Sequence, residues 1–216
     1  MTRRALLATM MILSLALPCA AATAPAALTS VDSDVKETEL GSLVSDALRA
    51  LDEKAQIAFF PAGSLKDATI PEGEIKTDGI RACLKFPEDK TAILELSGDQ
   101  ILRALERSVG TLPQKNQGFL QVSGVSFAAN LKSPKGSRVS NVKVGKEDLD
   151  KEKKYRVITS APLAKGGHGY FTIWDKKAIE QSKADEISVS SAVEQFLGKQ
   201  TTLDYRDKKR IVVKDK

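Results

Sequence analysis

The clearest hydrophobic pattern in the chain is a helical repeat that begins at Leu40. Its members are Leu40, Leu43, Val44, Ala47, Leu48 and Leu51. Spacings of three and four residues place side chains on one face of an α-helix, so the repeat predicts an amphipathic helix. The same spacing predicts a helix after Ser97, which can cap its first turn, and another over Ile187–Leu197. A shorter helix, capped by Thr77 or Asp78, is expected to run to about Leu84.

Strand patterns lie between these helices. Apolar or alternating runs predict strands at Gln56–Phe60, Thr91–Leu96, Phe119–Asn130, Arg138–Val144, Tyr155–Ala161 and Arg210–Val213. A turn at Ser133–Gly136 predicts that Phe119–Asn130 and Arg138–Val144 form a hairpin. Arg210–Val213 is predicted to be an edge strand. Because helices and strands mix without regular βαβ alternation, we expect an α+β fold, a single layered domain of mixed sheets packed with helices.

The N-terminus has the composition of a targeting segment. Arg3 and Arg4 precede an apolar run from Ala5 to Leu17 and then small residues, which is typical of a secretory signal peptide. We expect a signal peptide over residues 1–22, cleaved near Ala22 or Ala24. A mobile lead-in over 23–34 and a domain over 35–216 would follow. The protein would then be exported, to the periplasm or out of the cell.

Charge and cysteine content limit the classes of ligand and the chemistry that the sequence allows. The chain has 33 Lys and Arg and 28 Asp and Glu, and loss of two arginines with the signal leaves a net charge of +3. These charges are interspersed, which argues against a nucleic-acid surface but favours small anionic ligands. No second apolar run is long enough to span a membrane. Cys83 lies in an apolar stretch and is expected to be buried rather than catalytic.

Metal-dependent catalysis by this chain alone is not expected. A two-metal phosphatase centre needs several imidazole and carboxylate ligands, and His168 is the only histidine. Motifs for a serine nucleophile or for a phosphate-binding loop are also missing. We therefore assign no catalytic residue, no metal ligand and no cofactor from the sequence.

Four segments, in order, carry a resemblance to a known family. They are Glu39–Leu51, Pro61–Lys66, Leu84–Pro87 and Pro162–Phe171. Together they resemble the substrate-binding, C-terminal domain of the 5′-nucleotidases, here without the metallophosphatase domain. The resemblance implies a base held between two aromatic rings, Phe86 of Leu84-Lys85-Phe86 and Tyr170 of Gly166–Tyr170. Stacking of this kind is worth roughly 1–3 kcal/mol per base.

The same resemblance implies further ligand contacts. Lys66 and Lys36 stand where the family has arginines, so they keep the positive charge without the planar fork. Gly63 and Gly167 would let the backbone approach the ligand. Asp175 could bind a ribose or a base edge. Pro61 departs from the family because it replaces an asparagine and cannot make that residue's hydrogen bonds.

Three functions remain open on the sequence. The first is an exported module that binds a nucleotide or nucleoside. The second is the non-catalytic half of a two-chain 5′-nucleotidase, whose metals come from a separately encoded metallophosphatase. The third is a structural or interaction protein with a degenerate pocket, in which Phe86 and Tyr170 are core aromatics and the lysines are solvated.

Overall fold

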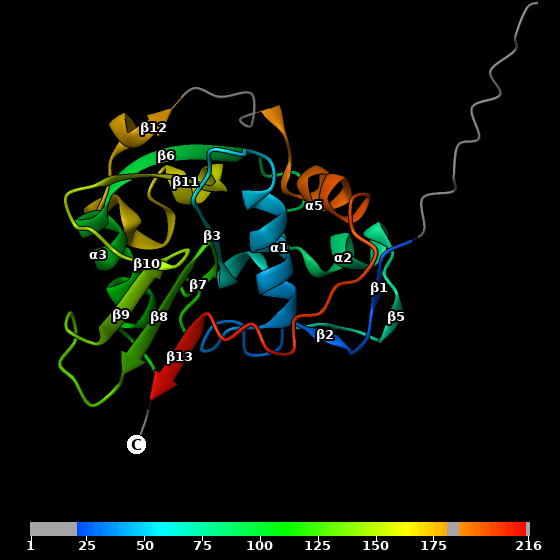
Figure 1. The fold of residues 1–216 in the computed structure, drawn as a ribbon, viewed down its shortest axis with the longest axis horizontal. Coiled ribbons are helices and arrows are strands. Elements are labelled where there is room, and N and C mark those ends of the chain that lie inside the picture. Colours follow the sequence, from blue (N-terminus) through cyan, green and yellow to red (C-terminus); the bar gives the residue numbers. More distant parts are fainter. Residues whose placement is uncertain (1–20, 181–185, 215–216) are drawn as a thin grey trace, which may run out of the picture.

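The computed structural model describes residues 21–180 and 186–214, which form a layered α+β domain (Figure 1). The expected signal peptide at 1–22 lies almost entirely outside these residues. The expected fold class is confirmed. Among the described residues, no helix is long and apolar enough to cross a membrane.

A five-stranded mixed sheet forms the middle layer. Its order is β12 (Ile179–Glu180), β6 (Thr91–Ser97), β11 (Lys154–Ser160), β3 (Ile57–Pro61), β7 (Leu120–Ser123). Strands β3 and β11 pair in parallel, and the other neighbours are antiparallel. Side chains of β3 alternate between the two faces, so Ala58 and Phe60 join one core cluster while Ile57 and Phe59 join the other. Burial on both faces explains the near-continuous apolar sequences of these strands.

Helices cover the first face of this sheet. They are α1 (Glu39–Arg49), α2 (Thr77–Cys83) and α5 (Val189–Leu197). The repeat predicted from Leu40 is the buried stripe of α1, except for Leu51, which lies beyond the end of the helix and is partly buried. Thr38 caps α1 by accepting a hydrogen bond from the Gly41 amide. The predicted caps of α2 are wrong, because its N-cap is Lys76, whose side chain makes no capping bond.

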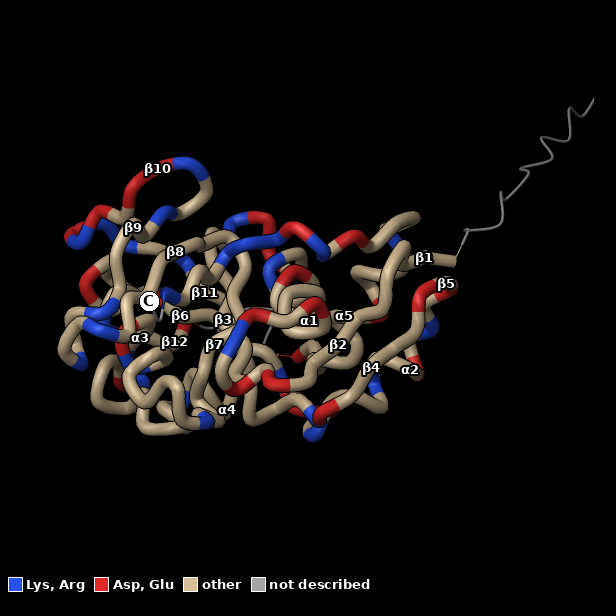
Figure 2. The backbone as a smooth tube through the Cα atoms, turned by 90° about the horizontal axis from the view of Figure 1, so that it is seen from below, with Lys and Arg blue, Asp and Glu red and all other residues tan. Residues whose placement is uncertain are grey.

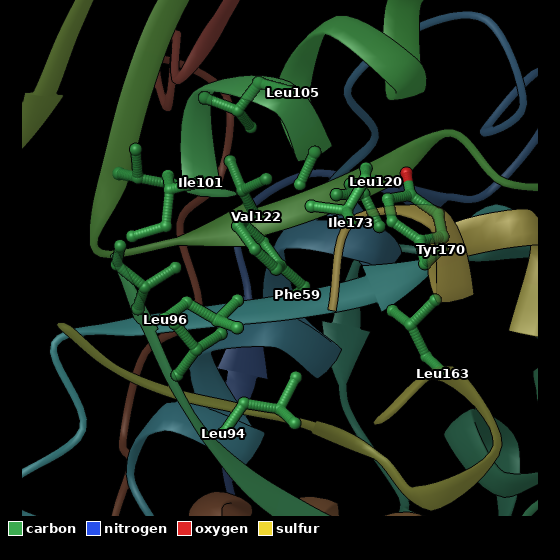
Figure 3. Close-up of a cluster of buried hydrophobic side chains, with 14 of the residues drawn as sticks. Phe59, Leu94, Leu96, Ile101, Leu105, Leu120, Val122, Leu163, Tyr170 and Ile173 are labelled. Atoms are coloured by element: carbon green, nitrogen blue, oxygen red, sulfur yellow. The ribbon is translucent and has the colours of Figure 1, made fainter. Parts of the chain in front are cut away.

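The second face packs against α3 (Gly98–Val109) and a second sheet. Ser97 caps α3 as predicted, in a reciprocal pair with Gln100. Figure 3 shows how Ile101 and Leu105 of α3 meet Phe59, Val122 and neighbouring side chains. The second sheet has the order β10 (Glu147–Asp148), β9 (Val139–Val144), β8 (Val125–Asn130), β13 (Ile211–Lys214). The predicted hairpin and the terminal edge strand are both present in this sheet.

The long strand predicted over Phe119–Asn130 is two strands in different sheets. Gly124 separates β7 from β8, with φ +74°. A Cβ at this position would lie 1.9 Å from the carbonyl oxygen of Gln56. Only glycine fits here, because the backbone is left-handed and also touches a neighbouring carbonyl. Continuous apolar sequence concealed the break.

The predicted mobile lead-in is packed against the domain. Residues 23–34 contain β1 (Thr23–Ala24) and β2 (Leu28–Thr29), which pair with β5 (Gly73–Glu74) and β4 (Thr69–Ile70). Leu28 is 1% exposed, and Ser30 is fully buried and donates to the Lys66 carbonyl at 2.6 Å. The folded unit therefore extends to the N-terminal side of residue 35, because these short strands cover the helical layer.

Candidate functional site

A short 3₁₀ turn, η1 (Ala62–Ser64), forms one wall of the candidate site. It follows directly from β3, which pairs in parallel with β11 in the central sheet. The amide of Ala62 donates to the Phe119 carbonyl at 2.8 Å, and the amide of Gly63 donates to the Gln117 carbonyl at 2.7 Å. These bonds fix the turn at the end of the strand, so it is a rigid platform.

The segment that carries Phe86 is paired with this turn. The Lys66 amide donates to the Cys83 carbonyl at 2.9 Å, and the Lys85 amide donates to the Ser64 carbonyl at 2.9 Å. These bonds bring Phe86 beside the turn while leaving its side chain in solvent, and the residue is 56% exposed. A phenyl ring that is held in place but solvated is available to a ligand.

A glycine-rich loop over Gly166–Phe171 forms the opposite wall. Gly166, His168 and Gly169 all have positive φ, at 89°, 54° and 80°. The imidazole of His168 covers the η1 turn so closely that a Cβ at Gly63 would lie 2.8 Å from His168 Cε1. Gly63 is therefore required for contact between turn and loop. It is buried beneath the histidine rather than open to a ligand.

Turn, aromatic and loop enclose a hollow of about 230 Å³. Its lining residues are Pro61, Ser64, Phe86, Asp89, Ser160, Pro162, Leu163, Gly167 and His168. The volume is below the roughly 300 Å³ at which pockets for drug-sized ligands begin, so it suits one ring system. Of the predicted ligand contacts, Phe86 and Gly167 line this hollow, and Gly63 lies under its edge.

Tyr170 does not lie where the resemblance places it. The residue is fully buried, and its ring stacks on Trp174 with centroids 5.0 Å apart. The guanidinium of Arg107 is 5.5 Å from the ring centroid, and Tyr170 Oη donates to the Gly118 carbonyl at 2.8 Å. Figure 3 shows the ring inside the core cluster. The predicted free aromatic face is absent because the ring is buried in the core.

The next residue, Phe171, is the exposed aromatic of the loop. It is 70% exposed, and its backbone returns to Gly166, whose carbonyl accepts its amide at 3.2 Å. A Cβ at Gly166 would lie 2.6 Å from the Phe171 Cβ. The glycine therefore permits a tight reversal that presents Phe171 to solvent.

Lys66 lies beside a second hollow, of about 340 Å³, on the other side of the η1 turn. This hollow is also lined by Asp34, Lys85, Lys115 and Gln117. The Lys66 ammonium donates one of its three protons to the Ala82 carbonyl at 2.8 Å. Asp34 is 8% exposed, and Lys115 approaches its Oδ2 to 3.7 Å. The surroundings of Lys66 are therefore of mixed charge rather than purely cationic.

The other two predicted contacts lie elsewhere. Lys36 is exposed and pairs with Asp32 at 3.1 Å, and it lines a different hollow near Tyr205. Asp175 accepts a hydrogen bond from the Lys177 amide at 2.8 Å and caps a 3₁₀ turn, η3 (Lys176–Ala178). Neither residue lines the hollows beside Phe86 or Lys66. Spacing along the chain could not reveal this, because both follow loops whose course depends on packing.

The histidine of the loop is electrostatically biased toward its neutral form. Burial lowers the pKa of His168 below its usual value, and the nearby Arg107 and Lys85 lower it further. The imidazole is therefore a neutral hydrogen-bonding group at physiological pH. No cluster of three or more histidine, cysteine or acidic side chains suited to a metal occurs in residues 21–180 and 186–214. Figure 2 shows both signs of charge interspersed along the backbone, without a single basic stripe.

Two polar residues of the first hollow were missed by sequence reasoning. Asp89 comes three residues after Phe86, and its amide closes a turn by donating to the Phe86 carbonyl at 3.2 Å. Ser160 ends β11, is 1% exposed, and its Oγ has no partner among the described residues. The Pro87-Glu88-Asp89 sequence was a visible turn signal for the first residue. Nothing near Ser160 in the sequence marked it.

Comparisons with known proteins identify the family of the chain. Residues 19–175 match the family described as 5′-nucleotidase, C-terminal domain. A 5′-nucleotidase of Diplobatis ommata is 32% identical over 177 residues, which cover 73% of this chain and 30% of that protein. The trifunctional nucleotide phosphoesterase protein YfkN of Bacillus subtilis is 30% identical over 143 residues, 62% of this chain and 10% of its own length.

A solved structure shares the fold at higher coverage. The crystal structure of a 5′-nucleotidase precursor from Thermus thermophilus superimposes with a TM-score of 0.79 and 29% identity, covering 91% of this chain and 40% of that one. The present chain therefore spans less than half the length of these relatives. It belongs to the 5′-nucleotidase C-terminal domain family.

Proposed function

We propose that this chain is a nucleotide- or nucleoside-binding module, with the base in the hollow beside Phe86. The observation that carries the proposal is the exposed Phe86 ring, which is fixed by backbone pairing with the η1 turn and borders a hollow sized for one ring system. Every base offers a π face to such a ring. Family membership supports the same ligand class.

The second ring of the proposed clamp is Phe171 rather than Tyr170. Tyr170 is fully buried, with Trp174 stacked on its ring and Arg107 beside it, whereas Phe171 is 70% exposed on the loop that lines the hollow through His168. Phe171 itself is not a lining residue of the hollow. The base would therefore stack on Phe86 first, and the Phe171 ring would then move to cover the base.

The sugar and any phosphate would extend toward the second hollow. Phe86 lines the first hollow and the preceding Lys85 lines the second, so the two hollows are adjacent. Lys66 and Lys85 would supply positive charge to an anionic group there. Asp34, in the same hollow, would instead accept hydrogen bonds from sugar hydroxyls.

Calorimetry on the mature chain tests the proposal, with adenosine, AMP, UMP and UDP-glucose as ligands. We expect at least one to bind, and Phe86→Ala to weaken binding by about 5- to 150-fold, which corresponds to the loss of one stacking contact. Val212→Ala is the matched control, because Val212 is an exposed apolar residue at 41% on β13, outside both hollows. Equal affinity in wild type and Phe86→Ala would overturn the assignment of Phe86.

A second function is favoured by how little of its relatives the chain spans. It covers 30% of one 5′-nucleotidase and 40% of another, and its described residues hold no metal cluster. We propose as the alternative that a separately encoded metallophosphatase supplies the catalytic centre, after export of both chains. Phosphate release from AMP would then need both proteins, whereas release by this chain alone would contradict the alternative.

A further inference from the structure

The first hollow contains one carboxylate that the fold does not use. Asp89 lines the hollow, and its side chain forms no hydrogen bond or ion pair with any residue that the structure describes, although its backbone amide and carbonyl are both bonded, to Phe86 and Val189. No lysine or arginine is among the lining residues. A partly desolvated carboxylate with no partner is costly, and a ligand with N–H donors would relieve that cost.

A second unpartnered group lines the same hollow. Ser160 is 1% exposed, and its Oγ has no hydrogen-bond partner in the described part of the chain. A hydroxyl can donate to a carbonyl oxygen, which a carboxylate cannot do. The two groups therefore supply an acceptor of two hydrogen bonds and a donor of one.

The common bases differ in how well they match these groups. Guanine presents a carbonyl, a ring N–H and an amino group in sequence along one edge, so one carboxylate can accept two adjacent N–H groups. Adenine and cytosine each offer only an amino group beside a ring acceptor. The single N–H of uracil lies between two carbonyls, which a carboxylate repels. Paired hydrogen bonds to a charged acceptor are stronger than single ones, and they add geometric specificity.

We propose that Asp89 and Ser160 make this hollow selective for guanine. Asp89 would accept the ring N–H and the amino group, Ser160 would donate to the carbonyl oxygen, and Phe86 would stack on the ring. This inference rests on the proposed function, because it assumes a base in this hollow. It adds which base the site prefers and which residues choose it.

Calorimetric titration of the mature protein with guanosine, inosine and adenosine tests the preference. Inosine differs from guanosine only by loss of the amino group, so it isolates that contact. We expect guanosine to bind about 5- to 150-fold more tightly than inosine, the range for one good paired contact to a base. In Asp89→Asn this ratio should fall, because one neutral amide oxygen replaces two charged acceptors, while adenosine affinity changes little.

Matched variants separate selectivity from folding. Asp175→Asn is the control, because Asp175 lies outside the hollow and caps a turn. Ser160→Ala should weaken guanosine and inosine equally, since both carry the carbonyl. If nucleosides bind but guanosine is no tighter than inosine, the guanine inference is overturned and the proposed function stands. If no nucleoside binds, both are overturned.

Discussion

The guanidinium of Arg107 joins the glycine-rich loop to the core through Tyr170. Its carbon lies 5.5 Å from the centre of the Tyr170 ring, and its Nε donates to the His168 carbonyl at 2.9 Å. A Cβ added at position 169, where the chain has glycine, would lie 2.0 Å from Nη2 of this guanidinium and would collide with it. One arginine on α3 therefore fixes the position of the histidine that lines the proposed base site.

Removal of Arg107 should loosen this loop. Arg107→Ala loses a charge-assisted hydrogen bond and a cation–π contact, so we expect the free energy of unfolding to fall by about 2 kcal/mol. Urea denaturation measures the change. Arg206→Ala is the control, because Arg206 is exposed and pairs with Asp204, two residues away. Equal stability of the two variants would contradict the role given to Arg107.

The buried position of Tyr170 predicts losses of stability of different size for two substitutions. Tyr170→Phe keeps the ring and removes the hydroxyl that donates to the Gly118 carbonyl, so we expect a loss of about 1 kcal/mol of stability and unchanged nucleoside affinity. Tyr170→Ala removes a stacked core ring and should cost about 3–5 kcal/mol. Loss of nucleoside binding in a folded Tyr170→Phe variant would show that the Tyr170 hydroxyl belongs to the binding site.

Glycine at position 124 is required by the change of sheet between β7 and β8. Gly124→Ala would place a Cβ 1.9 Å from the Gln56 carbonyl in a backbone with positive φ. Gly136→Ala is the matched control, because φ is also positive there, at 87°, but no atom lies within 4 Å of the added Cβ. We expect about 1–2 kcal/mol of destabilisation in the control and clearly more at Gly124. Thermal and urea unfolding of the pair would measure the difference.

Glu37 should make stability depend on pH. Its Oε2 accepts the amides of Arg210 and Ile211 at 2.8 and 2.9 Å, and Oε1 accepts the Ser42 hydroxyl. Burial raises the pKa of Glu37 above its ordinary value of 4.5, although these hydrogen bonds and Arg210 oppose the shift. The folded state then binds the proton more readily. Its stabilising contribution is present below pH 4.5 and is lost as pH rises through the folded pKa.

Glu37→Gln removes this titration. The stability of the variant relative to wild type should therefore increase from pH 4.5, the ordinary pKa, toward neutral pH, as urea unfolding at several pH values would show. Glu147→Gln serves as the control, since Glu147 is exposed on β10. A difference between Glu37→Gln and wild type that stays constant with pH would argue against a raised pKa.

Cys83 is expected to resist alkylation in the folded protein. The residue is 5% exposed, its Sγ donates to the Gly79 carbonyl at 3.2 Å, and burial raises the pKa of the thiol above its usual 9.0. Little thiolate is present at neutral pH, and reagents cannot reach it. Mass spectrometry after iodoacetamide treatment should find modification only in denaturant. Rapid labelling of the native protein would contradict burial.

Local patterns predicted the elements better than they predicted the site. The helical repeat from Leu40 and the cap at Ser97 depend on nearby residues, and both were confirmed. The Gly124 break and the packing of Leu28 depend on contacts with distant segments, which no local pattern records. In the glycine-rich loop, too, local sequence does not show which aromatic residue is buried. Tyr170 and Phe171 are adjacent in sequence, and only the reversal at Gly166 decides which is buried.

The pairing of β13 with β8 has a consequence for the order of events during synthesis. Ile211 pairs with Phe127, so β8 has an open edge until the chain has been made beyond residue 211. Unpaired strand edges favour association with other chains, and contacts this distant in sequence form slowly. Until β13 has been made, the β8 edge of a nascent chain is therefore open to association with other chains.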